Sequence, residues 1–159
     1  MSLLARAYAR ISPRLAHGPG SAAVTKAHAA LIRRTNGRFG TRFFGGGRLL
    51  VLRTTGRRSG QPRESPMLFH DDGDALVVCA ANGASRRPPA WWLNLQAEPR
   101  AEALVRGRWR RVRARKATDE ERRRLWPRLQ ETYEGHDHYL AIATRELPVV
   151  LLEPDDASG

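Results

Sequence analysis

Short apolar stretches recur along the chain from residue 49 onward and predict β-strands. Residues 49–54 read Leu-Leu-Val-Leu-Arg-Thr, and residues 75–81 and 147–152 form two further apolar runs. In residues 111–115 arginine alternates with valine and alanine, which is typical of a strand with one solvated face. Turn residues separate these segments, so consecutive strands are expected to pair as hairpins. About five or six antiparallel strands with three short helices indicate a mainly β, α+β barrel.

Local sequence signals locate the start of two of the helices in the barrel domain. Pro89 suits the first turn of a short helix from Ala90 to about Ala97. Thr118 and Glu121 occupy the reciprocal positions of a capping box, which predicts a helix beginning there. A Gly-Gly-Gly run at 45–47 precedes a strand and is expected to be a flexible entry turn.

The first 44 residues differ from the rest in pattern. Apolar residues at 4, 7, 11 and 15 have helical spacing, and Arg6, Arg10 and Arg14 form a second stripe. Ser21 suits the N-cap of another helix that reaches about Thr35. We expect a helical arm over 1–44, a barrel domain over 45–154 and a tail over 155–159. The arm either packs on the domain or attaches its basic face to an anionic membrane surface.

Composition favours an anionic partner. The chain has 159 residues, which suits one domain, and 28 Lys plus Arg against 16 Asp plus Glu, a formal charge of +12 at pH 7. A basic solvated surface accounts for the same excess, so both interpretations stay open. No recognised nucleic-acid motif accompanies the arginines, and nucleic acid is therefore not expected as a partner.

Other classes of site are excluded by what the chain lacks. The single cysteine, Cys79, permits neither a disulfide framework nor a thiolate zinc site. His136 and His138 lack a convincing third ligand, so no metal site is expected. No apolar run approaches the roughly 18 residues of a membrane span. We expect a cytoplasmic protein, with peripheral attachment to the inner face of the membrane as the alternative.

The Gly-Arg-Arg-Ser-Gly segment at 56–60 has the chemistry of a phosphate site. Its glycines allow backbone N–H groups to turn inward, its serine adds a hydroxyl, and its arginines offer charge-assisted bidentate bonds. An ordinary basic hairpin turn is the alternative, and the Walker A pattern is absent. The residues of this candidate site are Gly56, Arg57, Arg58, Ser59, Gly60 and Arg63.

Aromatic residues supply the second half of a candidate cofactor site. Trp91 and Trp92 are consecutive helix residues that point about 100° apart, so one can fill the core while the other faces a cleft. Core packing alone is the alternative. An aromatic wall beside an anion-binding loop suits a flat, phosphorylated cofactor.

Four blocks of sequence, taken together, carry a resemblance to a known family. They are residues 50–63, the Pro-x-Trp-Trp-x-Asn-Leu-x-x-x-Pro pattern at 89–99, residues 117–126 and residues 145–154. In this order they resemble the deazaflavin (F420)-dependent nitroreductase family. The resemblance implies a split β-barrel, related to flavin mononucleotide-binding barrels, that binds coenzyme F420. It also implies hydride transfer from the reduced coenzyme to a quinone-like or nitroaromatic acceptor.

The resemblance assigns roles to residues of the candidate cofactor site. Arg57, Arg58, Ser59 and Arg63 would hold the coenzyme phosphate and its glutamate tail, and Trp91 would lie against the deazaflavin.

It also places residues at two further points. Ala81 and Asn82 fall in the cofactor region where some relatives carry Ser-Lys, and this removes one hydroxyl and one ammonium. Tyr133, His136 and Tyr139 fall on the acceptor side, where any of the three is able to donate a proton.

Alternatives remain open at this stage. One is a flavin mononucleotide (FMN)-dependent reductase on the same fold, and another is a non-catalytic carrier of the coenzyme or of a fatty acid. The natural acceptor is not specified, and both a monomer and a homodimer fit the sequence.

Overall fold

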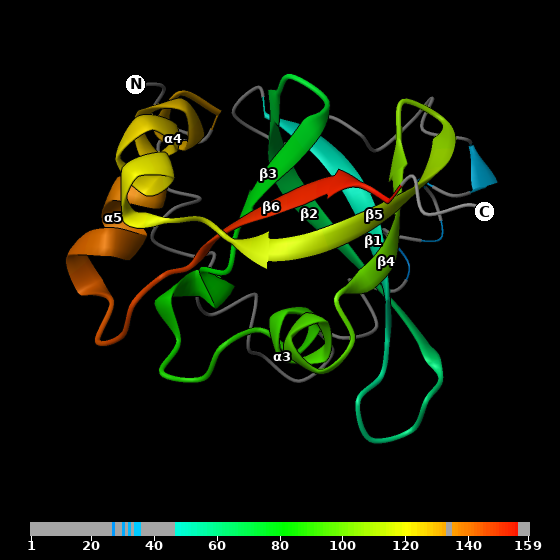
Figure 1. The fold of residues 1–159 in the computed structure, drawn as a ribbon. Helices are drawn as coiled ribbons and strands as arrows, with labels where there is room; N and C mark the ends of the chain where they lie inside the picture. Colours follow the sequence, from blue (N-terminus) through cyan, green and yellow to red (C-terminus); the bar gives the residue numbers. More distant parts are fainter. Residues whose placement is uncertain are drawn as a thin grey trace.

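A closed antiparallel barrel forms the body of the protein (Figure 1). The computed structural model describes residues 47–132 and 135–155, with residues 27, 30, 32, 34 and 35 of the N-terminal segment. The strands in this part of the chain are β1 (Arg48–Thr55), β2 (Pro62–Asp72), β3 (Ala75–Cys79), β4 (Arg100–Val105), β5 (Arg108–Lys116) and β6 (Val149–Pro154). They are ordered β1-β2-β3-β6-β5-β4, and β4 pairs back onto β1. The barrel expected from the sequence is confirmed.

Three α-helices and one short 3-10 helix accompany the strands in the described residues from 47 onward. They are η1 (Asn82–Ala84), α3 (Ala90–Ala97), α4 (Asp119–Thr132) and α5 (Gly135–Ile142). In Figure 1, α3 lies at the end of the barrel where the β1–β2 connection projects, whereas α4 and α5 lie together at one side. Both predicted helices, at 90–97 and after Thr118, are confirmed.

Successive side chains of each strand point to opposite faces of the barrel wall, and this separates an interior core from two outer ones. Leu50 and Leu52 of β1 belong to the interior cluster, to which all six strands and both tryptophans of α3 contribute. Val149 and Leu151 of β6 face the other way and pack against α4. Because both faces of these strands are covered, they read as continuous apolar runs in the sequence.

Ile32 of the N-terminal segment packs on the outer face of β1. Leu49 and Val51 cluster there with Ile32, which is 1% exposed. Residues 27, 30, 32 and 34 are helical, in agreement with the helix predicted to reach Thr35. The basic stripe at 6, 10 and 14 lies outside the described residues, so its attachment to a membrane surface stays a prediction.

Gly47 has a different role from the one expected. A Cβ at this position would lie 2.5 Å from Leu68 Cδ2 and 2.7 Å from the carbonyl oxygen of Thr132. Gly47 therefore lets β1 start in close contact with the end of α4. Its neighbours at 45 and 46 lie outside the described residues. Separately, no helix in the described parts of the chain is long and apolar enough to cross a membrane.

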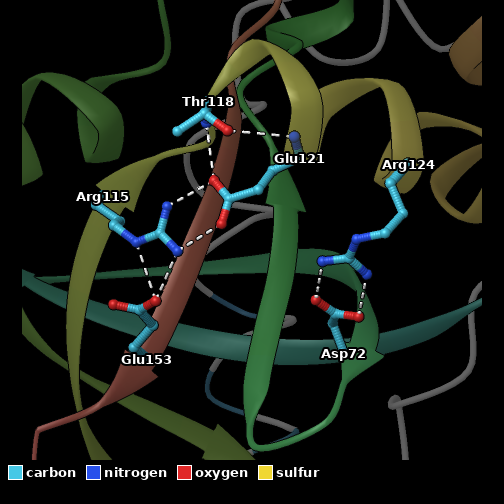
Figure 2. A network of polar contacts seen from close by, with 6 residues as sticks. All are labelled: Asp72, Arg115, Thr118, Glu121, Arg124 and Glu153. Atoms are coloured by element: carbon cyan, nitrogen blue, oxygen red, sulfur yellow. Dashed lines mark hydrogen bonds and ion pairs between the residues drawn. The ribbon is translucent and has the colours of Figure 1, made fainter.

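A network of polar contacts fastens the start of α4 to the barrel (Figure 2). The Glu121 N–H donates to Thr118 Oγ1 (3.2 Å) and the Thr118 N–H donates to the Glu121 carboxylate (2.8 Å), which confirms the capping box. Arg115 of β5 donates two bonds of 2.7 Å to Glu121 and also pairs with Glu153 of β6 (2.8 Å).

A second ion pair holds α4 further along. Arg124 donates two bonds, of 2.7 and 2.8 Å, to the Asp72 carboxylate at the end of β2 (Figure 2). Such a bidentate pair fixes direction as well as distance. Together with the packed apolar face, these pairs fix α4 against β2, β5 and β6.

The Glu121 network makes the stability of the protein depend on pH in the acid range. Bonds from Arg115 first, and then from the Thr118 N–H, lower the pKa of Glu121 to about 2. A carboxyl whose folded pKa lies below its unfolded value of about 4.3 contributes stability above that value. This contribution is lost as pH falls toward 2.

We expect Glu121→Gln to reduce the acid sensitivity of folding. Between pH 5 and pH 2 the urea midpoint of the variant should fall less than that of the wild type. At pH 7 the variant should be less stable by about 0.5–1 kcal/mol, as for a partly exposed pair. Glu120→Gln, in the same helical turn, is the matched control. An equally steep decline in Glu121→Gln would show that the pair contributes nothing.

Candidate functional site

The connection between β1 and β2 is a tight basic loop built around Gly56. The Gly56 N–H donates to the carbonyl of Gln61 (2.9 Å), and the Ser59 and Gly60 N–H groups donate to the carbonyl of Gly56 (3.1 and 2.7 Å). A Cβ at Gly56 would lie 2.9 Å from Ser59 Oγ and 3.0 Å from the carbonyl oxygen of Gln61, so a larger residue would force the loop to adjust. Gly60 has φ +67°, which favours glycine. The predicted hairpin loop is confirmed.

Asn94 of α3 fixes this loop to the helix. Its side-chain oxygen accepts bonds from the backbone N–H and from Nη1 of Arg57, both 3.2 Å. Its amide nitrogen donates to Thr54 Oγ1 of β1 (3.1 Å), and the residue is 4% exposed. The sequence pattern contained Asn94 without indicating a role for it. The signal in the sequence was an asparagine three residues after Trp91, in an otherwise mainly apolar helix.

The loop, the start of β2 and α3 line an open cavity of about 380 Å³. This volume lies within the range of ordinary ligand sites. The structure thus brings together residues that are separate in the sequence. Six of the residues that line the cavity are Arg57, Arg58, Ser59, Arg63, Trp91 and Asn94. Gly56 also lines the cavity, whereas Gly60 lies at the exposed tip of the loop.

Positive charge dominates this cavity. Arg63 Nη2 donates to Ser59 Oγ (3.3 Å), which leaves the charge of its guanidinium uncompensated there. Within the described residues, Arg58 has no hydrogen-bond or ion-pair partner. The carboxylate of Glu64, also in the lining, pairs with Arg53 (2.9 Å). The cavity therefore suits an anion, with guanidinium N–H groups as donors.

Trp91 and Trp92 both belong to the interior of the barrel end. Each is 9% exposed, and their rings meet edge to face with centroids 6.4 Å apart and planes at 67°. Trp91 alone of the two also lines the cavity. It thus presents an aromatic surface beside the arginines while its neighbour completes the core.

Ala81 and Asn82 lie in the connection between β3 and α3, outside the lining of this cavity. Ala81 is buried. The Asn82 side chain donates to the carbonyl of Arg87 (2.9 Å), which closes the connection on itself.

The residues assigned to the acceptor side are on or next to α5. Tyr133 lies outside the described residues. His136 is 5% exposed, with its Nδ1 2.9 Å from the carbonyl oxygen of Leu129, so this nitrogen donates and joins α5 to α4. Tyr139 is half-buried, with its ring 6.4 Å from that of His138. Neither His136 nor Tyr139 lines the arginine cavity.

Comparison with known proteins places these features in a family. The family model described as F420H(2)-dependent quinone reductase matches residues 24–154. The match includes residues 24–44, which the sequence pattern assigned to the arm. Over 128 residues the chain is 36% identical to an F420H(2)-dependent quinone reductase from Mycobacterium tuberculosis, covering 79% of this chain and 86% of that relative.

Solved structures share the fold. An F420-H2 dependent reductase superposes with a TM-score of 0.61 at 25% identity, over 66% of this chain and 93% of that one. A protein described as a domain-swapped dimer gives a TM-score of 0.65 at 22% identity, over 85% of this chain and all of that one (100%). The second similarity concerns the fold alone.

The Asn94 contacts predict an energetic coupling between α3 and β1. Asn94→Leu removes the acceptor of the Arg57 N–H and the donor to Thr54, so it should destabilise the protein by about 1–3 kcal/mol. Thr54→Val removes the hydroxyl that Asn94 binds. Urea unfolding of the two single variants and of the double variant measures the coupling. The loss of stability in the double variant should be smaller than the sum of the two single losses, by about 0.5–1.5 kcal/mol. Additive costs would contradict a direct bond.

Proposed function

Because the chain belongs to the F420H(2)-dependent quinone reductase family, we propose that the arginine-lined cavity binds coenzyme F420 for the reduction of a quinone. The protein is an oxidoreductase whose coenzyme is F420. The observation that carries the assignment of the site is the meeting of Trp91 with three arginines at one cavity.

The residues present fit the chemical groups of this coenzyme. A phosphate and the carboxylates of a glutamate tail require several cationic donors, which Arg57, Arg58 and Arg63 supply. A flat ring system requires an aromatic surface, which Trp91 supplies. Gly56, which also lines the cavity, leaves the backbone at this point uncovered by a side chain.

The reaction places modest demands on the protein. A reduced deazaflavin supplies two electrons as hydride, so no covalent nucleophile is needed. The chain's own task is to hold donor and acceptor in register and to supply a proton. Asn94, which accepts from the Arg57 N–H and donates to Thr54 Oγ1, keeps the loop fixed relative to Trp91 before binding. Such preorganisation reduces the cost of ordering on association.

Acceptor-side roles are proposed for Tyr133, His136 and Tyr139. α5 carries the last two and packs against both α4 and η1. His136 Nδ1 donates to the carbonyl of Leu129, so the proposed role in proton transfer falls to its other ring nitrogen, Nε2. A nitroaromatic compound is proposed as a second class of acceptor, because it too accepts hydride and a proton.

Titration of the purified protein with oxidised F420 and with FMN, followed by fluorescence, tests the proposed function. We expect F420 to bind well below millimolar concentration, more tightly than FMN, and a quinone such as menadione to oxidise the reduced coenzyme only with enzyme present. Preference for FMN would make the protein a flavin reductase. Binding of F420 without turnover of any quinone or nitro compound would make it a carrier.

Arg58→Ala should weaken F420 binding by about 1.5–3 kcal/mol, or roughly 10- to 150-fold in Kd. The reason is that Arg58 lines the cavity without a protein partner among the described residues, so its donors are available to an anion. Arg123→Ala is the matched control, because it removes the same charge from an exposed position of α4. Equal affinities in both variants would remove Arg58 from the site.

A further inference from the structure

A left-handed turn interrupts the connection between β3 and α3. Three consecutive residues have positive φ, namely Asn82 (49°), Gly83 (59°) and Ala84 (58°). The Ala84 N–H donates to the carbonyl of Ala81 (2.9 Å) and the Ser85 N–H donates to that of Asn82 (3.1 Å). Glycine and asparagine tolerate this region, but alanine rarely adopts it. Contacts from elsewhere in the protein must therefore hold the turn.

Arg145 provides those contacts from a distant part of the chain. Its Nη2 donates to the carbonyls of Ala80 (3.1 Å) and Ala81 (2.8 Å), before the turn. Its Nε donates to the carbonyl of Ser85 (2.8 Å), after the turn. A bond from Nη1 to the carbonyl of Glu146 (2.8 Å) fixes the guanidinium within its own segment. One planar group thus bridges both ends of the turn.

The hydrogen bonds of the Arg145 guanidinium in the described residues all go to backbone carbonyls. Within the described residues its guanidinium makes no ion pair with a carboxylate, and burial lowers its pKa. Charge-assisted bonds to carbonyls are stronger than neutral ones. A lysine is a poor substitute, because its single ammonium group cannot reach carbonyls on both sides of the turn as the planar guanidinium does.

The location of this contact links the two sides of the proposed site. The turn belongs to the connection that leads into α3, and α3 contributes Trp91 and Asn94 to the cavity. Arg145 belongs to the segment between α5 and β6, which runs beside that connection in Figure 1. α5 also packs against η1 directly.

We propose that Arg145 is a positioning residue of the coenzyme site, which holds the left-handed turn at 82–84 and thereby sets the place of α3 and its cavity wall. This inference rests on the proposed function, since it takes the cavity as the coenzyme site. Arg145 acts through the turn and α3, not by contact with the coenzyme.

Arg122 offers a matched control on the neighbouring helix. Its Nη1 donates to the carbonyl of Leu147 (2.6 Å), in the same segment as Arg145, and its guanidinium lies 4.6 Å from the ring centroid of Trp126. It makes no bond to the turn. Arg122→Met and Arg145→Met each remove one guanidinium that binds the 143–148 region, but only the second releases the turn.

The experiment measures hydrogen exchange, coenzyme binding and kinetics on the full chain. In Arg145→Met, exchange at the amides of Ala84 and Ser85 should rise about tenfold or more, because the turn opens locally. The Kd for F420 should rise about fivefold or more, and KM for the coenzyme should change more than kcat. Arg145→Lys should restore little of this. Arg122→Met should leave exchange at the turn and F420 affinity near wild type.

Each other outcome overturns a defined claim. Unchanged exchange at Ala84 and Ser85 in Arg145→Met would show that the turn does not need Arg145. Faster exchange with unchanged F420 affinity would show that the turn does not position the coenzyme site. Equal losses of affinity in Arg122→Met and Arg145→Met would indicate a general loss of packing. Failure of the wild type itself to bind F420 would overturn the proposed function, and with it the role of Arg145.

Discussion

The early separation of β1 from β4 is the constraint from which the site arises. β1 pairs with β2 as far as Thr55, but with β4 only from Val51 to Arg53. Beyond Arg53, one edge of β1 therefore has no neighbouring strand among the described residues. α3 packs against β1, and the bond from Asn94 to Thr54 Oγ1 joins them just past the last β1–β4 pair. A buried amide thus replaces strand pairing where the barrel opens.

Distribution of charge, more than net charge, distinguishes this opening. Several arginines elsewhere in the described residues are matched by acids that hold the fold together: Arg115 joins Glu121 to Glu153, and Arg124 pairs with Asp72 (Figure 2). At the cavity the one carboxylate of the lining, Glu64, pairs with Arg53. Arg57, Arg58 and Arg63 therefore present charge that no carboxylate among the described residues neutralises. An excess of +12 alone cannot make this distinction.

Local patterns predicted the fold well, because alternation and capping depend on neighbouring residues. The capping box of Thr118 and Glu121 and the loop at 56–60 are of this kind. Contacts between residues far apart in the sequence leave no comparable local pattern. Asn94 meets a loop 37 residues earlier, and Arg145 meets a carbonyl 65 residues earlier. Gly47 likewise resembled a turn residue, although the nearby end of α4 is what requires a glycine there.

Side-chain contacts to backbone carbonyls, together with the ion pairs of α4, bring the two sides of the proposed site into one framework. His136 fixes α5 to α4 through the carbonyl of Leu129, and α4 is fixed to the barrel by its ion pairs. Arg145, just after α5, holds the connection into α3. The proposed acceptor helix and the helix beside the coenzyme cavity are thus fastened to each other through backbone carbonyls. The proposed hydride transfer requires the donor and acceptor atoms to keep a fixed relative position, and a framework of this kind restricts their relative motion.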